Sequence, residues 1–259
     1  MPLNQTFELQ PNGDTALDIR FEETPGENLS ERIIALAETV ESSSLTSVTE
    51  LVPAYQSLTV CFDPLQLPQT HSGDPDTAAL EQALKALTEK VLKDETPAVR
   101  ERHVIRIPVC YDGEFAPDMP TLRAQSGLSE QEIIARHAAP RYLVHMLGFT
   151  PGFLYLGGLD KRLQCPRKTR PALSVPAGSV GIGGTQTGIY PQDTPGGWQI
   201  IGRTPLALFR PTQTPAFLAR PLDYIQFVPI STEQFAAIAP LSAPEKIPLA
   251  DAKVVEHGR

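Results

Sequence analysis

Apolar residues alternate with polar ones, or recur at helical spacing, along the first part of the chain. Leu17, Ile19 and Phe21 alternate as in a strand, whereas Leu29 and Ile33 begin a run with the spacing of an amphipathic helix. The same criteria predict strands at residues 17–21, 49–52, 58–62 and 104–109, and helices at residues 29–40 and 80–91. This β-α-β-β-α-β order is typical of the split βαβ, ferredoxin-like arrangement. We predict an α+β domain of this kind at residues 1–98, ending in a charged, proline-containing stretch.

Capping signals predict two short helices in the next segment. Asp118 can cap the first helix and Gly127 can end it, while Ser129 and Glu132 form a capping box for the second. Helix, glycine turn and helix also occur in DNA-binding helix-turn-helix domains. In such a domain, Glu130 and Glu132 would face the DNA, which repels carboxylates. We therefore favour a helical corner that leads into a β-domain.

Strand patterns and glycines dominate the rest of the chain. The predicted strands lie at residues 142–147, within residues 175–204, at Leu206 to Leu208 and at residues 225–228. They define a mainly-β domain at residues 99–240. Residues 241–259 are rich in proline, alanine and charge, and we predict a flexible C-terminal tail there.

The composition narrows the class of protein. The 26 prolines in 259 residues are about twice the ordinary usage, which favours strands and loops. A net charge of −8 argues against nucleic acid or an anionic membrane as the main partner. The 3 isolated cysteines fit no metal or redox spacing and favour a reducing compartment. With neither a signal-peptide pattern nor a membrane-length apolar run, we expect a cytoplasmic protein.

Residues 175–204 hold 8 of the 18 glycines and the only tryptophan, Trp198. Glycine permits close approach of the backbone to a ligand or to another strand. Uncharged polar side chains such as Ser179, Gln186 and Tyr190 can orient a small polar ligand by hydrogen bonds. Two interpretations stay open here: a ligand-lined surface, and a glycine-rich β-structure that binds nothing.

Two motifs before this segment carry further candidate chemistry. Phe149, Phe153 and Tyr155 lie on a loop braced by proline and glycine, which lowers the entropy lost when aromatic rings are held at a surface. Residues 161–170 contain five cations, and a cationic patch can hold a carboxylate or a phosphate. Arg167 and Arg170, each next to a proline, are the stronger candidates; a solvated, charged turn is the alternative.

Two histidines have structural alternatives to a role in chemistry. His137 ends the second short helix, where the helix dipole favours a protonated imidazole, so it is either a helix cap or a group facing the following loop. His145 shares a strand face with Leu143 and Leu147, which favours a packed histidine.

The common catalytic motifs are absent from the sequence. It has no Gly-Lys pair for a phosphate loop, no G-x-S-x-G nucleophile elbow, and no H-E-x-x-H or C-x-x-C spacing for a metal. The residues thus predict a binding surface in the second domain that another chain completes.

Several long segments resemble one bacterial family. They are G-D-T-A-L and V-P-A-Y-Q-S-L-T-V in the first domain, I-P-V-C-Y-D-G-E-F-A-P-D from Ile107, H-A-A-P-R-Y-L-V-H-M-L-G-F-T-P-G-F-L-Y-L-G-G-L-D from His137, and V-P-A-G-S-V-G-I-G-G-T-Q-T-G-I-Y-P with P-G-G-W-Q-I-I-G-R-T-P-L from Val175. The chain resembles the B subunits of bacterial ATP-dependent 5-oxoprolinases. Their family also includes the histidine-kinase inhibitor KipI and proteins labelled allophanate hydrolase subunit 1. The resemblance implies a small N-terminal α+β domain and a C-terminal cyclophilin-like β-barrel.

The resemblance also implies an activity and partners. A protein of this family would pair with the C subunit (KipA-like) of 5-oxoprolinase, share an active site with it, and join the A subunit (LamB/YcsF-like). Together they would hydrolyse 5-oxo-L-proline to L-glutamate with hydrolysis of ATP, which would bind with or without Mg²⁺. This chain would be inactive by itself. Activation of the lactam by phosphorylation needs cations near the developing phosphate charge and donors for the substrate carboxylate.

The motif matches suggest roles for individual residues. His137 would be an acid–base or orienting group, Arg167 would hold the anion, and Gln186 and Tyr190 would hold the substrate amide or carboxylate. The substrate-binding candidates are Phe149, Phe153, Tyr155, Ser179, Trp198 and Arg203. No metal ligands are predicted.

Three other functions remain open from the sequence. One is a non-catalytic inhibitor that docks on a sensor histidine kinase, as KipI does. Another is a component of a urea- or allophanate-related amidohydrolase. Prolyl isomerase activity would rest on fold analogy alone.

Overall fold

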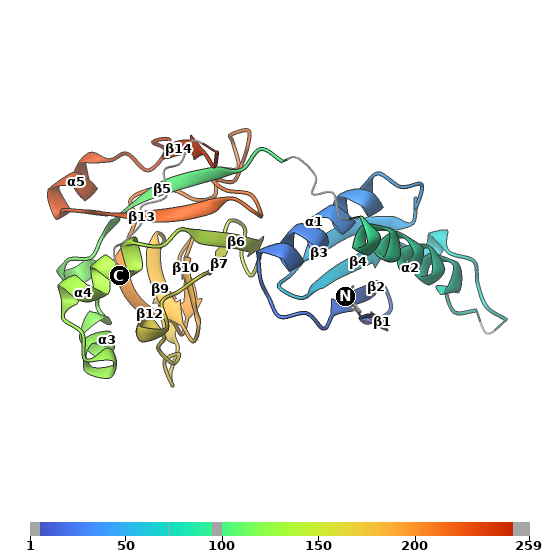
Figure 1. Ribbon diagram of the computed structural model, residues 1–259, viewed down its shortest axis with the longest axis horizontal. Helices are drawn as coiled ribbons and strands as arrows, with labels where there is room; N and C mark the ends of the chain where they lie inside the picture. Colours follow the sequence, from blue (N-terminus) through green and yellow to red (C-terminus); the bar gives the residue numbers. More distant parts are fainter. Residues whose placement is uncertain (1–5, 72, 95–99, 251–259) are drawn as a thin grey trace. The chain divides into compact units, whose positions relative to one another are not determined.

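The computed structural model describes residues 6–71, 73–94 and 100–250, and its chain divides into two compact units, Met1–Arg100 and Glu101–Arg259. The predicted boundary at residue 98 lies outside the described residues. The elements of the first unit, in blue to teal in Figure 1, are β1 (Phe7–Pro11), β2 (Ala16–Phe21), α1 (Glu27–Glu41), β3 (Val48–Pro53), β4 (Ser57–Phe62) and α2 (Ala78–Lys93).

The first unit is an antiparallel sheet, in the order β1-β2-β4-β3, packed against α1 and α2. Alternate residues of β2 and β4 point into its core, as the period of two requires. The buried stripe of α1 includes Leu29, Ile33 and Leu36, and α2 contributes Leu80 and Leu84. The hydrophobic spacing therefore predicted both helices and both central strands correctly.

The predicted β-α-β-β-α-β order is wrong in its last strand. The strand expected at residues 104–109 belongs to the sheet of the second unit, and β1 pairs beside β2 at the edge of the first sheet. Alternation along a strand defines which faces are apolar but does not define the partner strand, so the sequence could not distinguish the two sheets.

The second unit is a closed β-barrel with helices and a small extra sheet (Figure 1). Its elements are β5 (His103–Cys110), α3 (Met119–Ser126), α4 (Glu130–Ala138), β6 (Tyr142–Leu147), β7 (Leu154–Gly157), β8 (Ala172–Val175), β9 (Ser179–Gly183), β10 (Gln186–Ile189), β11 (Thr194–Gly196), β12 (Gln199–Arg203), β13 (Tyr224–Ile230), α5 (Thr232–Ala237) and β14 (Glu245–Pro248).

The strand order β12-β9-β10-β7-β6-β13-β5 closes where Arg203 on β12 pairs with Cys110 on β5. Among the described strands, β13 pairs with β5 in parallel, while β14 lies antiparallel along the other edge of β5. Strands β8 and β11 form a separate two-stranded sheet.

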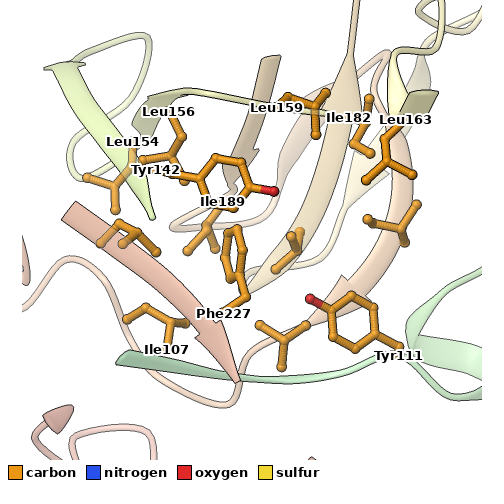
Figure 2. Close-up of a cluster of buried hydrophobic side chains, with 14 of the residues drawn as sticks. Ile107, Tyr111, Tyr142, Leu154, Leu156, Leu159, Leu163, Ile182, Ile189 and Phe227 are labelled. Atoms are coloured by element: carbon orange, nitrogen blue, oxygen red, sulfur yellow. The ribbon is translucent and has the colours of Figure 1, made fainter. Parts of the chain in front are cut away.

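Side chains fill the barrel, so its interior is a packed core. Figure 2 shows Tyr111, Tyr142, Ile189 and Phe227 pointing inward from separate segments. Helix α4 contributes Ile133, which is fully buried in the same core. The ligand surface must therefore be sought outside the barrel wall.

The predicted helical corner is confirmed in position. Gly127 has a left-handed φ of 69° at the end of α3, and Ser129 and Glu132 form the capping box of α4. Asp118 occupies the N-cap position of α3 but makes no side-chain cap bond. Its carboxylate instead accepts hydrogen bonds that tie a loop to β12, as described below.

Two expectations for the C-terminal part are corrected. Leu206 and Leu208 are buried but lie in irregular structure, not in a closing strand. The predicted flexible tail from residue 241 is wrong for β14, and the Arg210 guanidinium also donates to Ser242 O at 2.7 Å. Residues 251–259 of that tail lie outside the described part. No helix within the described ranges is both long and apolar enough to cross a membrane.

Candidate functional site

The outer surface of β7, β9 and β10 brings the predicted site residues together. On β10, Thr187 and Ile189 point into the barrel, so Gln186 and Gly188 must point outward. Tyr155 on β7 lies directly opposite Gly188 in the antiparallel register and therefore shares this outer face. We call this surface the outer face.

A buried aromatic cluster covers the outer face. The ring of Phe153 stands edge-on to Tyr190 and to Trp198, with centroids 5.3 and 5.5 Å away, and Val175 and Ile200 complete the cluster. Edge-to-face packing of this kind is favourable for aromatic pairs. Only 5% of Trp198 is exposed. These rings therefore form a rigid support.

Glycines on β9 and β10 leave the space that the Trp198 indole occupies. A Cβ atom at Gly183 would lie 2.5 Å from indole Nε1, and one at Gly188 would lie 3.0 Å from the indole Cζ3. No side chain fits between the strands and the ring at such distances. Packing against Trp198 thus explains why these two positions are glycine. For them, the interpretation of residues 175–204 as a glycine-rich β-structure without a ligand is sufficient.

The cationic loop is fixed against the same cluster. The Lys168 ammonium lies 2.6 Å from Asp118 Oδ2, and that oxygen also accepts from the Ile200 backbone N–H at 2.7 Å. Lys168 N–H donates to Gly197 O, and the Gln199 side chain donates to Pro166 O. The loop is therefore more than a solvated, charged turn.

Arg167 lies over the indole of Trp198, with its guanidinium carbon 5.8 Å from the ring centroid. Cation and ring attract each other in this arrangement. Arg167 forms no ion pair with any residue that the structure describes, whereas Lys168 beside it is paired. The fork of five N–H donors is thus available for an anion above a rigid aromatic surface.

Two tyrosines lie within the electrostatic reach of Arg167. Burial raises the pKa of Tyr155, and the charge of Arg167 opposes part of that rise. Burial likewise raises the pKa of Tyr190, against the lowering effects of a backbone hydrogen bond from Trp198 and of Arg167. Both phenols therefore stay protonated near neutral pH and can act as hydrogen-bond donors.

Phe149 completes the accessible part of the outer face. It is 64% exposed, stands edge-on to Phe153, and has a left-handed φ of 67°. A bulky residue seldom adopts this backbone conformation, and such outliers concentrate at functional sites.

The predicted residues thus separate into groups. Phe149, Tyr155, Arg167 and Gln186 are exposed or half-buried on or beside the outer face. Phe153, Tyr190 and Trp198 are buried beneath them and support them, and the predicted contact of these three with substrate stays a prediction. Ser179, also buried, and Arg203 face each other across β9 and β12 at the far end of the outer face.

The structure does not bring His137 to this face. His137 is fully buried inside the barrel, where its ring stacks on Phe227 at 4.5 Å. Burial lowers its pKa from 6.5 to about 3, so the protonated, dipole-stabilised cap is wrong. His137 does not reach the outer face from this position, and its predicted acid–base or orienting role stays a prediction.

His137 belongs to a buried hydrogen-bond chain. Its Nε2 lies 2.9 Å from Thr187 Oγ1, which donates to Gly181 O at 3.0 Å. The Thr187 hydroxyl has one proton, so it must accept from Nε2–H, and Nδ1 must accept from the Tyr111 hydroxyl at 2.8 Å. The neutral Nε2–H tautomer therefore links α4 to the inner side of β9 and β10.

Sequence reasoning missed Tyr111 as a member of this hydrogen-bond chain. It grouped Thr187 with the polar side chains that could orient a ligand, although Thr187 shares a strand face with the buried Ile189 on β10, which is a signal for burial. His137 also follows Ile133 by four residues on the apolar stripe of α4, which is a signal for burial. Nothing in the sequence indicates Tyr111. The other candidate histidine, His145, is packed as expected: it lies over Gly157, where a Cβ would be 2.1 Å from its Nε2.

Comparison with known proteins shows the class to which this fold belongs. Residues 7–219 match the family model described as carboxyltransferase domain, subdomain C and D. The crystal structure of TTHA0988 superimposes with a TM-score of 0.67 at 36% identity, covering 83% of this chain. This chain spans 40% of the length of that protein.

Two curated relatives identify the family more closely. The chain is 41% identical to the 5-oxoprolinase B subunit of Bacillus subtilis over 231 residues, which cover 89% of this chain and 96% of the relative. It is 39% identical to the 5-oxoprolinase B subunit of Escherichia coli O157:H7, over 84% of this chain and 93% of the relative. The chain belongs to the family of 5-oxoprolinase B subunits.

Proposed function

We propose that this chain is the B subunit of an ATP-dependent 5-oxoprolinase, and that its outer face binds 5-oxo-L-proline. The observation that carries the proposal is Arg167, held over Trp198 on a fixed loop and without a carboxylate partner in the described residues. Membership of the family supports the substrate.

The outer face offers a group for each part of this substrate. The Arg167 fork matches the carboxylate, and Trp198 below it limits the orientations of the guanidinium. The protonated Tyr155 hydroxyl and the Gln186 amide can donate to the lactam oxygen. Phe149 supplies apolar surface for the ring methylenes. Donors aimed at this oxygen also orient it for phosphorylation by ATP, which activates the lactam carbon for attack by water and for cleavage of the ring C–N bond, with ADP and phosphate as the other products.

ATP fits this chain only in part. A guanidinium also suits a phosphoryl oxygen, but the sequence lacks the Gly-Lys of a phosphate loop. Among the described residues, no three histidine, cysteine, aspartate or glutamate side chains gather as Mg²⁺ ligands would. The role that we assign to this chain is to hold the small acid, with the nucleotide bound largely by partner subunits.

The architecture is consistent with a shared site. We assign the first unit to the ferredoxin-like arrangement, with β1 in place of the last strand, and the barrel to the cyclophilin-like class. We propose that the KipA-like subunit, a second barrel of this class, completes the outer face, and that the LamB/YcsF-like subunit is the third component. The greater length of TTHA0988 supports this proposal, because that relative carries further polypeptide on the same chain.

Reconstitution with the KipA-like and LamB/YcsF-like subunits tests the proposed function. Glutamate release and ATP hydrolysis should require all three proteins and 5-oxo-L-proline, and this chain alone should be inactive. Urea offered in place of 5-oxoproline should give no turnover; turnover of urea alone would support the amidohydrolase alternative instead. Absence of 5-oxoproline turnover in the full complex, together with inhibition of a histidine kinase, would replace the proposal by the kinase-inhibitor function.

A further inference from the structure

An open cavity of about 440 Å³ lies at the end of the barrel where β9 begins and β12 ends. One wall is formed by residues 177–178 and by residues 203–207, which include the last residue of β12 and the segment after it. The opposite wall is the C-terminal segment from Phe235 to Pro240. A cavity of this size is sufficient for a small organic ligand.

Hydrogen bonds fix both walls. Ala207 N–H donates to Pro240 O at 2.8 Å, and Thr204 N–H donates to Gly178 O at 2.9 Å. The buried Arg210 guanidinium donates to Ala207 O at 2.9 Å and to Ser242 O at 2.7 Å, which links the two walls behind the cavity. The cavity is therefore a built feature of the fold.

The residues that line the cavity carry a single charge, which is positive. Among the described residues, Arg203 is the only charged one in the lining, and its Nε donates to Ala177 O at 2.9 Å, which orients the guanidinium. Neither Arg203 nor Arg210 forms an ion pair within the described parts of the chain. An oriented, uncompensated guanidinium attracts an anion.

The remaining lining restricts the kind of anion. Apart from Arg203 and Thr204, the lining side chains are glycine, alanine, proline, leucine, isoleucine and phenylalanine. A phosphate surrounded by these groups would lose hydration and gain only the side-chain donors of one arginine and one threonine hydroxyl. A carboxylate with an apolar body would keep its charge at Arg203 and bury its hydrocarbon part.

We propose that this cavity binds a small monocarboxylic acid with a compact apolar body, at a site separate from Arg167. This proposal concerns binding by the chain itself and does not depend on the proposed function. It also accounts for Arg203, which the resemblance had suggested as a substrate-binding residue.

Methyl NMR of the full chain with labelled alanine tests the proposal. Ala177, Ala207 and Ala236 line the cavity and report on it directly. Titration with cyclopentanecarboxylate should shift these methyl signals in a saturable manner. Cyclopentanecarboxamide, of the same shape but uncharged, and inorganic phosphate should bind at least about tenfold more weakly. Equal binding of the amide or of phosphate, or the absence of saturable shifts at these methyls, would overturn the proposal.

Two variants with matched controls separate the ligand contact from folding. Arg203→Gln should weaken cyclopentanecarboxylate binding by about tenfold or more, whereas Arg220→Gln, at an exposed position outside the lining, should not. Ala236→Phe fills the cavity from its rim and should abolish binding, whereas Ala237→Phe, on the same helix but outside the lining, should leave it intact. Wild-type affinity in both Arg203→Gln and Ala236→Phe would contradict the site.

Discussion

The guanidinium of Arg167 lies 5.8 Å from the centre of the Trp198 ring and has no carboxylate partner in the described structure. Its neighbour Lys168, by contrast, is paired with Asp118. One cation therefore fixes the loop, and the other is available above a rigid aromatic support. This difference in pairing distinguishes Arg167 from an ordinary surface arginine, whose charge is stabilised by solvent alone.

Arg167→Ala should weaken 5-oxoproline use while leaving the fold intact. Loss of a charged, bidentate contact costs about 1.5–3 kcal/mol, or roughly 10- to 100-fold in kcat/KM of the reconstituted complex. The exposed cation–ring contact contributes at most about 1 kcal/mol to stability. Urea unfolding and steady-state kinetics measure the two effects. Arg123→Ala, at an exposed position of α3, is the matched control, and equal kinetics for both variants would remove Arg167 from the site.

Trp198→Ala should destabilise the second unit by about 3–5 kcal/mol, because the indole is almost completely buried. Gly183→Ala should cost about 1–3 kcal/mol, since its Cβ would overlap the indole. Gly197→Ala is the control: the atom nearest to its Cβ would be at 3.7 Å, an ordinary contact, and we expect a change within about 0.5 kcal/mol. Equal stability of the Gly183 and Gly197 variants in chemical denaturation would argue against close packing of the Trp198 indole on Gly183.

The buried His137 should make the barrel sensitive to acid. Its folded pKa of about 3 lies below the unfolded value of 6.5, so only the unfolded chain binds a proton between these values. The free energy of unfolding therefore decreases as pH falls below about 6.5. Between pH 7 and pH 5, His137 alone should lower it by about 2 kcal/mol.

The difference between wild type and His137→Gln isolates this contribution. The variant should start from a lower stability at pH 7 but should lose about 2 kcal/mol less than the wild type on acidification to pH 5. His71→Gln, at an exposed position, should follow the wild type. Parallel pH profiles for wild type and His137→Gln would show that the imidazole is not held neutral in the core.

Thr187→Val tests the hydrogen-bond chain through His137. Valine preserves the shape of threonine but leaves His137 Nε2–H and Gly181 O without the hydroxyl. We expect a loss of about 2–4 kcal/mol in the free energy of unfolding. Thr187→Ser keeps the hydroxyl, loses one methyl group and should cost about 1 kcal/mol. A serine variant less stable than the valine variant would contradict the hydrogen-bond chain through His137.

Residues with strong local patterns were predictable from the sequence, and long-range pairing was not. The stripe from Leu29 to Val40 and the alternation from Leu17 to Phe21 predicted their elements, because burial on one face imposes a period. Strands β1 and β14 were missed, since both are short edge strands with mixed polarity, and Tyr155 was placed on a loop although it lies on strand β7. The pairing of these strands depends on partners far away in the chain, which no local pattern records.

The sequence did not define the burial of the candidate site residues. The motif matches suggested Phe153, Tyr190 and Trp198 for one site, and the three rings do pack together, yet a sequence does not state which ring lies beneath another. Arg167 was chosen from a cluster of five cations, and only the structure shows that Lys168 in the same cluster is paired. The burial of His137 inside the barrel was not predicted, because its position at a helix end outweighed its spacing from Ile133.

The most direct test of a 5-oxoproline site at Arg167 uses the single tryptophan of the chain. This chain, labelled with 5-fluorotryptophan and assembled with the unlabelled KipA-like and LamB/YcsF-like proteins, gives one ¹⁹F NMR signal, from Trp198. Saturating 5-oxo-L-proline should shift that signal in the wild-type complex, and the shift should be lost in the Arg167→Ala complex. An unchanged signal in a wild-type complex that turns over 5-oxoproline would contradict a substrate site at this face.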